Sequence, residues 1–567
     1  MIWSQNYDPF GSPVLSTLVA AIPVVVLLGG IGLLHMRAHI AALVGLGSAL
    51  LVAILAFGMP TGMALRAAGF GAAYGLLPIG WIILNIIFLY NLTNERGQFE
   101  ILRDSIARVT EDSRLQLLLI AFCLGAFFEG AAGFGSPVAV TGAMLIGLGF
   151  TRLQASGLSL IANTAPVAFG ALGTPVLTLA AVTGLPLDEL STMVGRQIFP
   201  FAMIVPFWLI CAYCGFRRAL EVLPAALVVG ITFATVQMLV SSLHGPWLTA
   251  ITAAIASIIA LIAFLRVWSP KTIMHVNEAP LPKGDERVPV VSEGQSGQAV
   301  EEEGAVVASA GRPDAKALRL AWTPWLILTV LVFLWGLPFV KATLDGIFKP
   351  SLAFSGLDKL VQRVPPVAAA PELEAAVYNL NLLSATGSAI LLAALISGFV
   401  LGAKPHEIAA TYWRSFKMVI PSLLTIAAML ALGYLTRFSG ADATMGLAFA
   451  ATGFAYPFFG TLLGWLGVAV TGSDTASNVL FGGLQKVTSE QLGHSPILMA
   501  GANSAGGVMG KMIDAQSIVV ASTATQWFGQ EGRILRYVFI HSIVLGVLVG
   551  VLVMLQAYVW PFTQMVP

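Results

Sequence analysis

Charge is what this sequence has least of. Lys, Arg, Asp and Glu make up 10% of its 567 residues, whereas apolar residues make up 57%. Soluble domains carry about 25% charged residues, so the deficit excludes a soluble enzyme, a nucleic-acid-binding protein and a disordered chain. The formal net charge of +1 gives no field that would attract a polyanion, and no nucleic-acid partner is expected.

Cysteine and metal-binding patterns are equally sparse. The three cysteines, Cys123, Cys211 and Cys214, all lie in apolar runs, and they form neither a disulfide framework nor a zinc spacing. The 7 histidines are scattered, and none pairs with another at the spacing of metal ligands. We therefore expect no metal site and no cofactor.

Long apolar runs dominate what is present. A membrane-spanning helix needs about 20 predominantly apolar residues. The sequence predicts an all-α polytopic membrane protein with about twelve spanning helices, and its 58 glycines and 30 prolines are typical of membrane proteins with broken helices. The predicted spans are residues 14–34, 40–58, 68–90, 155–182, 198–216, 222–242, 247–266, 320–340, 382–402, 416–436, 496–523 and 537–560.

The charged residues gather between these runs. Residues 271–319 are rich in charge, Gly, Ser and Pro, which predicts a flexible polar linker between an N-terminal membrane half, 1–270, and a C-terminal half, 320–567. Basic residues in the loops that follow alternate spans place those loops and the linker in the cytoplasm, and both termini outside. Basic residues in the loop 341–380 oppose this orientation.

Two apolar segments do not look like ordinary spans. Residues 115–150 contain one charge, Glu129, followed by a run rich in glycine that ends at Pro137. Residues 443–485 likewise contain one charge, Asp474. Glycine and proline break helices, and each arm is shorter than a full crossing. The pattern predicts two re-entrant hairpins.

A similar broken segment follows each hairpin. Residues 162–170 begin Ala-Asn163-Thr164-Ala, and residues 502–510 begin Ala-Asn503-Ser504-Ala. The predicted topology lets the two hairpins enter from opposite sides of the membrane. The chain is therefore predicted to contain an inverted repeat, which is a common plan for secondary transporters.

The residues that the two units share are candidates for a binding site. Half-helix ends carry unpaired N–H groups with partial positive charge, which can hold an anion, and short polar side chains can bond a carboxylate or a hydroxyl group. The alternative is that these side chains only satisfy the broken backbone. The expected substrate-binding residues are Asn163, Thr164, Gly133, Ser136, Ser473, Thr475, Asn503, Ser504 and Lys511.

Three acids in these segments are candidates for proton coupling: Glu129, Asp474 and Asp514. Acids inside a membrane are costly and usually functional, and a carboxyl group in apolar surroundings can hold a proton near neutral pH. For Asp474 the alternative is a helix cap. Asp514 lies three residues after Lys511, so its alternative role is an ion pair that only neutralises Lys511.

Several of these motifs resemble the bacterial L-lactate permease family, which includes glycolate permeases. The resemblance covers residues 3–560 apart from the linker. One departure stands out: the family usually has Ser-Pro where this chain has Asp514-Ala515, which bears on substrate choice and on coupling. The motifs that carry the resemblance are Gln5–Pro9, Glu129–Gly135, Asn163–Gly170, Val194–Gln197, Gly464–Gly467, Thr471–Thr475 and Gly510–Met512.

Membership would imply an inner-membrane carrier that moves a 2-hydroxymonocarboxylate, such as lactate or glycolate, together with a proton. It would also imply an elevator-like mechanism. Sodium coupling stays open as an alternative, and a homo-oligomer is compatible with the sequence. An intramembrane enzyme is not expected, because no Gly-x-Ser-x-Gly or His-Glu-x-x-His motif stands in a plausible context. A channel is disfavoured because paired repeats suit alternating access.

Overall fold

Helices form nearly all of the regular structure, as the long apolar runs predict. The computed structural model describes residues 2–32, 34, 36–98, 100–101, 105, 109–133, 136–281, 314–368, 370–527 and 530–567. Among these residues, ten helices are long and apolar enough to cross a membrane, or eleven if one bent pair counts as a span. The all-α polytopic fold is confirmed, with slightly fewer long spans than expected.

The set of helices that are long enough to span a membrane differs from the prediction in two ways. The predicted spans at 247–266 and 382–402 are the shorter apolar helices α15 (Thr249–Phe264) and α19 (Thr386–Val400). Conversely, both predicted hairpins contain a long apolar helix, Ser113–Ala131 in the first and Ala441–Thr471 in the second. Sequence hydropathy located the apolar runs but not where each helix ends.

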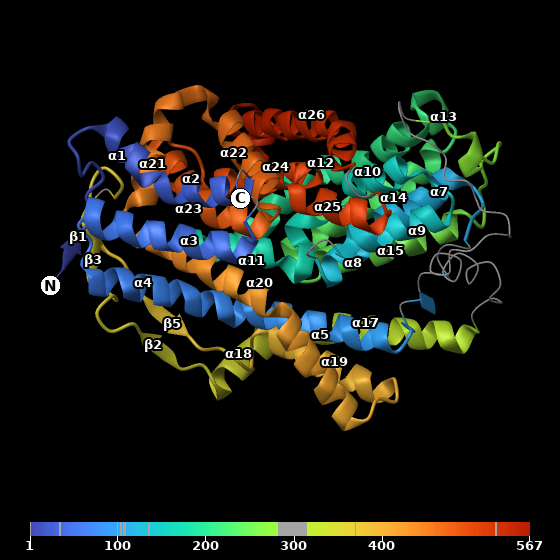
Figure 1. Cartoon of the computed structure of the whole chain (residues 1–567), viewed down its shortest axis with the longest axis horizontal. Helices are drawn as coiled ribbons and strands as arrows, with labels where there is room; N and C mark the ends of the chain where they lie inside the picture. The colour runs from blue at the N-terminus through green and yellow to red at the C-terminus, as the bar shows by residue number, and fades with distance from the viewer. Residues whose placement is uncertain are drawn as a thin grey trace.

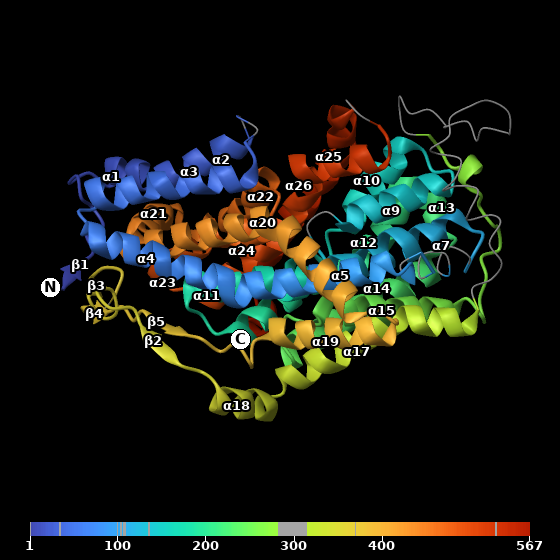
Figure 2. The same ribbon diagram turned by 60° about the horizontal axis from the view of Figure 1, so that its bottom comes forward.

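One group of helices packs around α20 (Pro405–Ser439), a 35-residue helix that contacts α3, α4 and α5 along its length. Figure 2 shows α3, α4 and α20 side by side. Helix α19 joins this group through α5 and α17. The other members are α1 (Pro13–Ala20), α2 (Ile22–Gly32), α3 (Ala38–Leu51), α4 (Thr61–Tyr74), α5 (Trp81–Glu95), α17 (Ala315–Gly336) and α18 (Pro338–Ile347).

The second group contains the two predicted repeat units, and its helices fill the upper and right-hand parts of Figure 1. The first unit comprises α7 (Ser113–Leu117), α8 (Gly125–Ala131), α9 (Ser136–Gly147), α10 (Arg152–Ala162) and α11 (Gly170–Thr183). The second comprises α21 (Ala441–Phe449), α22 (Tyr456–Thr471), α23 (Asp474–Gln491), α24 (Pro496–Gly510) and α25 (Ala515–Ala524). The remaining helices are α12 (Leu187–Cys214), α13 (Phe216–Leu220), α14 (Leu223–Leu243), α15 (Thr249–Phe264) and α26 (Glu531–Tyr558).

The two units have the same order of elements: a helical hairpin, a helix, a 3-10 turn and a further helix. Each hairpin turns at a glycine with a left-handed backbone, Gly133 (φ 60°) and Gly472 (φ 71°), a conformation that glycine adopts without steric cost. Elements of the two units pack together, α11 on α23, and α9 and α10 on α25. That the hairpins are re-entrant and the units inverted stays a prediction.

Both segments after the hairpins are broken. Helices α10 and α11 meet at 64°, across a 3-10 turn at Val167–Phe169. Ala171 and Leu172 at the start of α11 have left-handed backbones, with φ of 42° and 54°. In the second unit a 3-10 turn, Lys511–Ile513, separates α24 from α25. The predicted span 496–523 is therefore two short helices.

Two small sheets cover one end of the molecule. Strand β1 (Trp3–Ser4) pairs in parallel with β3 (Val361–Arg363), which pairs antiparallel with β4 (Glu372–Leu373). Strands β2 (Ser351–Ala353) and β5 (Val377–Asn379) form an antiparallel pair. The N-terminal segment is thus tied to the loop between α18 and α19, far along the sequence.

The predicted linker lies mostly outside the described residues, which omit 282–313. Its first part packs on the protein: the backbone N–H of Ser113 donates to Met274 O at 2.9 Å, and Arg114 Nη2 donates to Thr272 O at 2.7 Å. Its last residues, from Ala315, belong to α17. That the interior is flexible, and that the chain divides into halves there, stays a prediction.

Helices α22 and α24 approach so closely that their contact has no room for side chains at its glycines. A Cβ added to Gly464 would overlap Asn503 O, one added to Gly506 would overlap Thr461 O, and one added to Gly510 would overlap Trp465 O. Backbone contact of this kind needs small residues, as in helix pairs within membranes.

We expect Gly464→Ala to destabilise the protein by about 1–3 kcal/mol, because the added methyl group forces two helices apart. The measurement is the melting temperature of detergent-purified protein. Gly69→Ala in α4 is the matched control, since a Cβ there meets no atom within 4 Å and alanine favours a helix. Equal melting temperatures for the two variants would contradict this account of the α22–α24 contact.

Candidate substrate site

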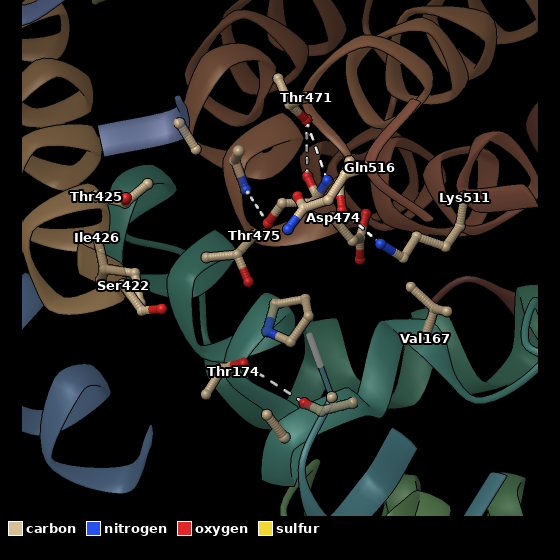
Figure 3. A pocket seen from close by; sticks show the side chains of 18 of the residues that line it. Val167, Thr174, Ser422, Thr425, Ile426, Thr471, Asp474, Thr475, Lys511 and Gln516 are labelled. Carbon is tan, nitrogen blue, oxygen red and sulfur yellow. Dashed lines mark hydrogen bonds between the residues drawn. The ribbon is translucent and has the colours of Figure 1, made fainter. Parts of the chain in front are cut away.

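A cavity of about 150 Å³ lies where the two units meet α20 (Figure 3). The second hairpin and the second broken segment supply a polar wall, while α20 and α11 supply a mostly apolar one. The polar wall includes Thr471, Gly472, Ser473, Asp474, Thr475, Lys511, Gln516 and Ser517. The apolar wall includes Val167, Ala171, Pro175, Ile426, Met429 and Leu430, together with the hydroxyl residues Thr174, Ser422 and Thr425.

Lys511 places a cation at the polar wall. Its side chain is 9% exposed, and its ammonium donates to Gly472 O at 2.6 Å. Nζ also lies 3.3 Å from Asp514 Oδ2. The predicted pairing of Lys511 with Asp514 is confirmed, although by another geometry: Lys511 belongs to a 3-10 turn and Asp514 is extended, so the pair bridges the helix break.

The carboxylate of Asp514 interacts with two neighbours, the backbone of Ser517 and the side chain of Lys511. It is fully buried, and its Oδ1 caps α25 by accepting from the backbone N–H of Ser517 at 2.7 Å. Its Oδ2 makes the ion pair with Lys511. A buried cation is tolerated only with such a partner. The Lys511 ammonium is therefore held at the cavity by one carboxylate and one backbone carbonyl.

The acid of each hairpin is bonded to the broken segment of its own unit. Asn163 Nδ2 donates to Glu129 Oε2 at 3.1 Å, and the Ser504 hydroxyl donates to Asp474 Oδ2. Both acids are buried and both line the cavity. Ser473, not Asp474, caps α23, since its Oγ accepts from Ala476 N at 3.2 Å. A cap therefore does not account for Asp474.

Sequence comparison decides the family. Residues 16–560 match the family described as L-lactate permease. The chain belongs to this family. It is 44% identical to the glycolate permease GlcA of Escherichia coli K12 over 98% of both chains, and 41% identical to the L-lactate permease of Bacillus subtilis 168 over the whole of both. Among solved structures, Neisseria gonorrhoeae MtrF, from a class of antimetabolite efflux pumps, is similar at a TM-score of 0.46 and 12% identity, over 90% of this chain and 85% of that one.

Family membership makes this chain a membrane permease rather than an enzyme. The ten or eleven candidate spans among the described residues fit a multi-pass membrane protein. Among the described residues, no group of three or more His, Cys, Asp or Glu side chains is placed to hold a metal ion.

Some of the predicted site residues line the cavity, and others lie behind the residues that line it. Residues at the cavity are Glu129, Gly133, Ser473, Asp474, Thr475 and Lys511. Asn163 of the first motif and Ser504 of the second lie behind them, hydrogen-bonded to Glu129 and Asp474 respectively. Thr164 donates to its own helix at Ile161 O, 2.9 Å away, and Asn503 bonds Asn478 and Gln485 inside the second unit. The side chain of Ser136 is outside the described residues.

Sequence reasoning missed several residues of the cavity. Thr471 begins a motif that was already singled out, Gln516 directly follows the Asp514-Ala515 departure, and Thr174 lies four residues after the first broken segment. Their proximity to those motifs was a usable signal. Ser422, Thr425 and the apolar residues of α20 (Figure 3) lie outside the repeats, and nothing local in the sequence distinguishes that stretch from another apolar span.

Proposed function

We propose that this permease imports a 2-hydroxymonocarboxylate, such as lactate or glycolate, together with a proton across the bacterial inner membrane. The observation that carries the proposal is a cation, Lys511, held among buried acids at a small cavity inside the repeat units. The names of the relatives, glycolate permease and L-lactate permease, support the substrate class. We place both termini outside, as the basic loops predict.

The size of the cavity suits a small acid. A cavity measured in this way needs about 10–15 Å³ to hold one water molecule. A cavity of about 150 Å³ therefore has room for a handful of non-hydrogen atoms. The polar wall offers an ammonium and hydroxyl groups to a carboxylate and its neighbouring hydroxyl. The apolar wall of α20, with Ile426 and Met429, offers room for a short alkyl group.

The balance of charge gives a reason for proton coupling. Among the described residues, the cavity and its wall hold the acids Glu129, Asp474 and Asp514 against the one ammonium of Lys511. With all of these ionised, the excess negative charge repels a carboxylate substrate in a poorly solvated site. Protonation of Glu129 or Asp474 removes part of that repulsion. Anion and proton then bind more favourably together than apart, which is the thermodynamic requirement for symport.

Purified protein in proteoliposomes tests the proposal. An inwardly directed proton gradient, with sodium absent on both sides, is expected to drive accumulation of radiolabelled L-lactate and glycolate. Addition of a protonophore is expected to abolish the accumulation. Accumulation that needs a sodium gradient and ignores the proton gradient would overturn proton coupling while leaving the substrate class intact. Failure to transport either acid under both gradients would overturn the substrate class.

A further inference from the structure

One hydroxyl group at the cavity has no hydrogen-bond partner within the described part of the chain. Ser517 lies in the first turn of α25 and contributes to the cavity lining, yet its side chain is 1% exposed. Its Oγ forms no hydrogen bond to any described residue. A buried polar group left unpaired costs about 1–3 kcal/mol, and such groups are rare enough that each calls for an explanation.

The other hydroxyl groups around the cavity either form hydrogen bonds or are less deeply buried. The buried side chain of Thr471 donates to Gly467 O at 2.6 Å, and Ser473 is the cap of α23. Thr475 and Ser422 are only half-buried, so leaving their hydroxyl groups without a protein partner costs less. Thr174 and Thr425 donate to backbone carbonyls of their own helices. Among the described hydroxyls that line the cavity, Ser517 combines burial with the lack of a partner.

Asp514 fixes Ser517 beside Lys511. One oxygen of this carboxylate accepts from the backbone N–H of Ser517 at 2.7 Å, and the other lies 3.3 Å from Lys511 Nζ. Because both neighbours are held by a single carboxylate, the ammonium and the first turn of α25 stand side by side. The wall therefore presents a cation next to an unpaired hydroxyl group.

A 2-hydroxymonocarboxylate carries the complementary pair, an anionic carboxylate on the carbon next to a hydroxyl group. An ammonium suits the carboxylate, and a serine hydroxyl, which both donates and accepts, suits another hydroxyl. We propose that Ser517 recognises the 2-hydroxyl group of the substrate, and so makes the permease prefer 2-hydroxy acids to unsubstituted monocarboxylates. This inference rests on the proposed function, whose substrate class it explains.

The test measures binding to the full chain purified in detergent, by isothermal titration calorimetry with L-lactate, propionate, glycolate and acetate. The wild type is expected to prefer L-lactate to propionate and glycolate to acetate. Ser517→Ala is expected to reduce each preference by about tenfold, the worth of one hydrogen bond in a site that excludes water. Its affinities for propionate and acetate stay at the wild-type values, because these acids have no 2-hydroxyl group to lose.

Ser522→Ala is the matched control. Ser522 lies on the same helix and is equally buried, but its hydroxyl donates to Val519 O and Glu531, and it does not line the cavity. This variant is expected to keep the wild-type preferences and to melt at a lower temperature. Ser517→Ala, which loses no hydrogen bond of the fold, is expected to melt no lower than the wild type.

Two results would overturn the assignment of Ser517. Unchanged preferences in Ser517→Ala would remove it from recognition, and an equal loss of affinity for all four acids would assign it to the carboxylate instead. If the alanine variant does not fold, Ser517→Cys, of similar size and with a weakly bonding thiol, is measured with the same expectations. A wild type that binds none of the acids would instead contradict the proposed function, which keeps the two failures apart.

Discussion

Replacing Lys511 with methionine is expected to destabilise the protein by about 3–5 kcal/mol, because it leaves a buried carboxylate without its cation. Asp514 is fully buried, and its Oδ2 pairs with Lys511. The double variant Lys511→Met, Asp514→Ser is expected to regain most of that stability, since serine also caps α25 and no unpaired charge remains. Melting temperatures of detergent-purified proteins, each checked for monodispersity, measure both effects.

The folded double variant then tests the site itself. If Lys511 holds the substrate carboxylate, the variant folds but binds L-lactate about 10–100-fold more weakly, the worth of a hydrogen bond to a charged group. Lys486→Met is the matched control: Lys486 is a half-buried lysine that donates to Thr183 O at 3.0 Å, away from the cavity lining. Unchanged L-lactate affinity in the double variant would remove Lys511 from the site.

Glu129→Gln is expected to abolish proton-driven accumulation of substrate while leaving exchange intact. The amide keeps the shape of the side chain and can still accept from Asn163 through its oxygen, but it cannot take up or release a proton. Accumulation under a proton gradient should therefore fall to the level without a gradient. Counterflow, in which unlabelled internal L-lactate draws in labelled L-lactate, should persist because it needs no net proton movement.

Asp442→Asn separates coupling from the mere loss of a buried acid. Asp442 in α21 is as buried as Glu129, at 6% against 5% exposure, but it does not line the cavity. We expect this variant to accumulate L-lactate as the wild type does. If Glu129→Gln accumulates L-lactate to the same ratio as the wild type, Glu129 is not the coupling residue. Asp474 then becomes the candidate.

Much of the fold can be predicted from the sequence because a membrane excludes charge from long runs. That single rule locates the apolar helices and exposes Glu129 and Asp474 as exceptions. Helix ends are harder, because the apolar runs continue past them: α15 and α19 both end inside the runs that predicted them. Likewise, hydropathy does not show that α7 and α8 continue as one long helix into the first hairpin.

The site was also partly predictable, because charged residues stand out in apolar segments. Acids, glycine turns and a lysine in an apolar segment are conspicuous, and the sequence predicts that Lys511 and Asp514 contact each other. Asn163 and Ser504, which belong to the repeated motif, were also conspicuous, but in the structure they orient the acids from behind the cavity wall. The contribution of α20 depends on which face of a 35-residue helix the repeat units meet, and only the packed structure shows that.

The left-handed backbone at Ala171 and Leu172 has a consequence for engineering this protein. A left-handed conformation costs a residue with a side chain about 1–2 kcal/mol, whereas glycine adopts it freely. Ala171 also lines the cavity, so the most direct route to a more thermostable protein, a glycine at that position, alters the wall that meets the substrate. The same few residues therefore affect both stability and transport, and a stabilised variant is better sought on α4, where Gly69 has room for a methyl group, away from this break.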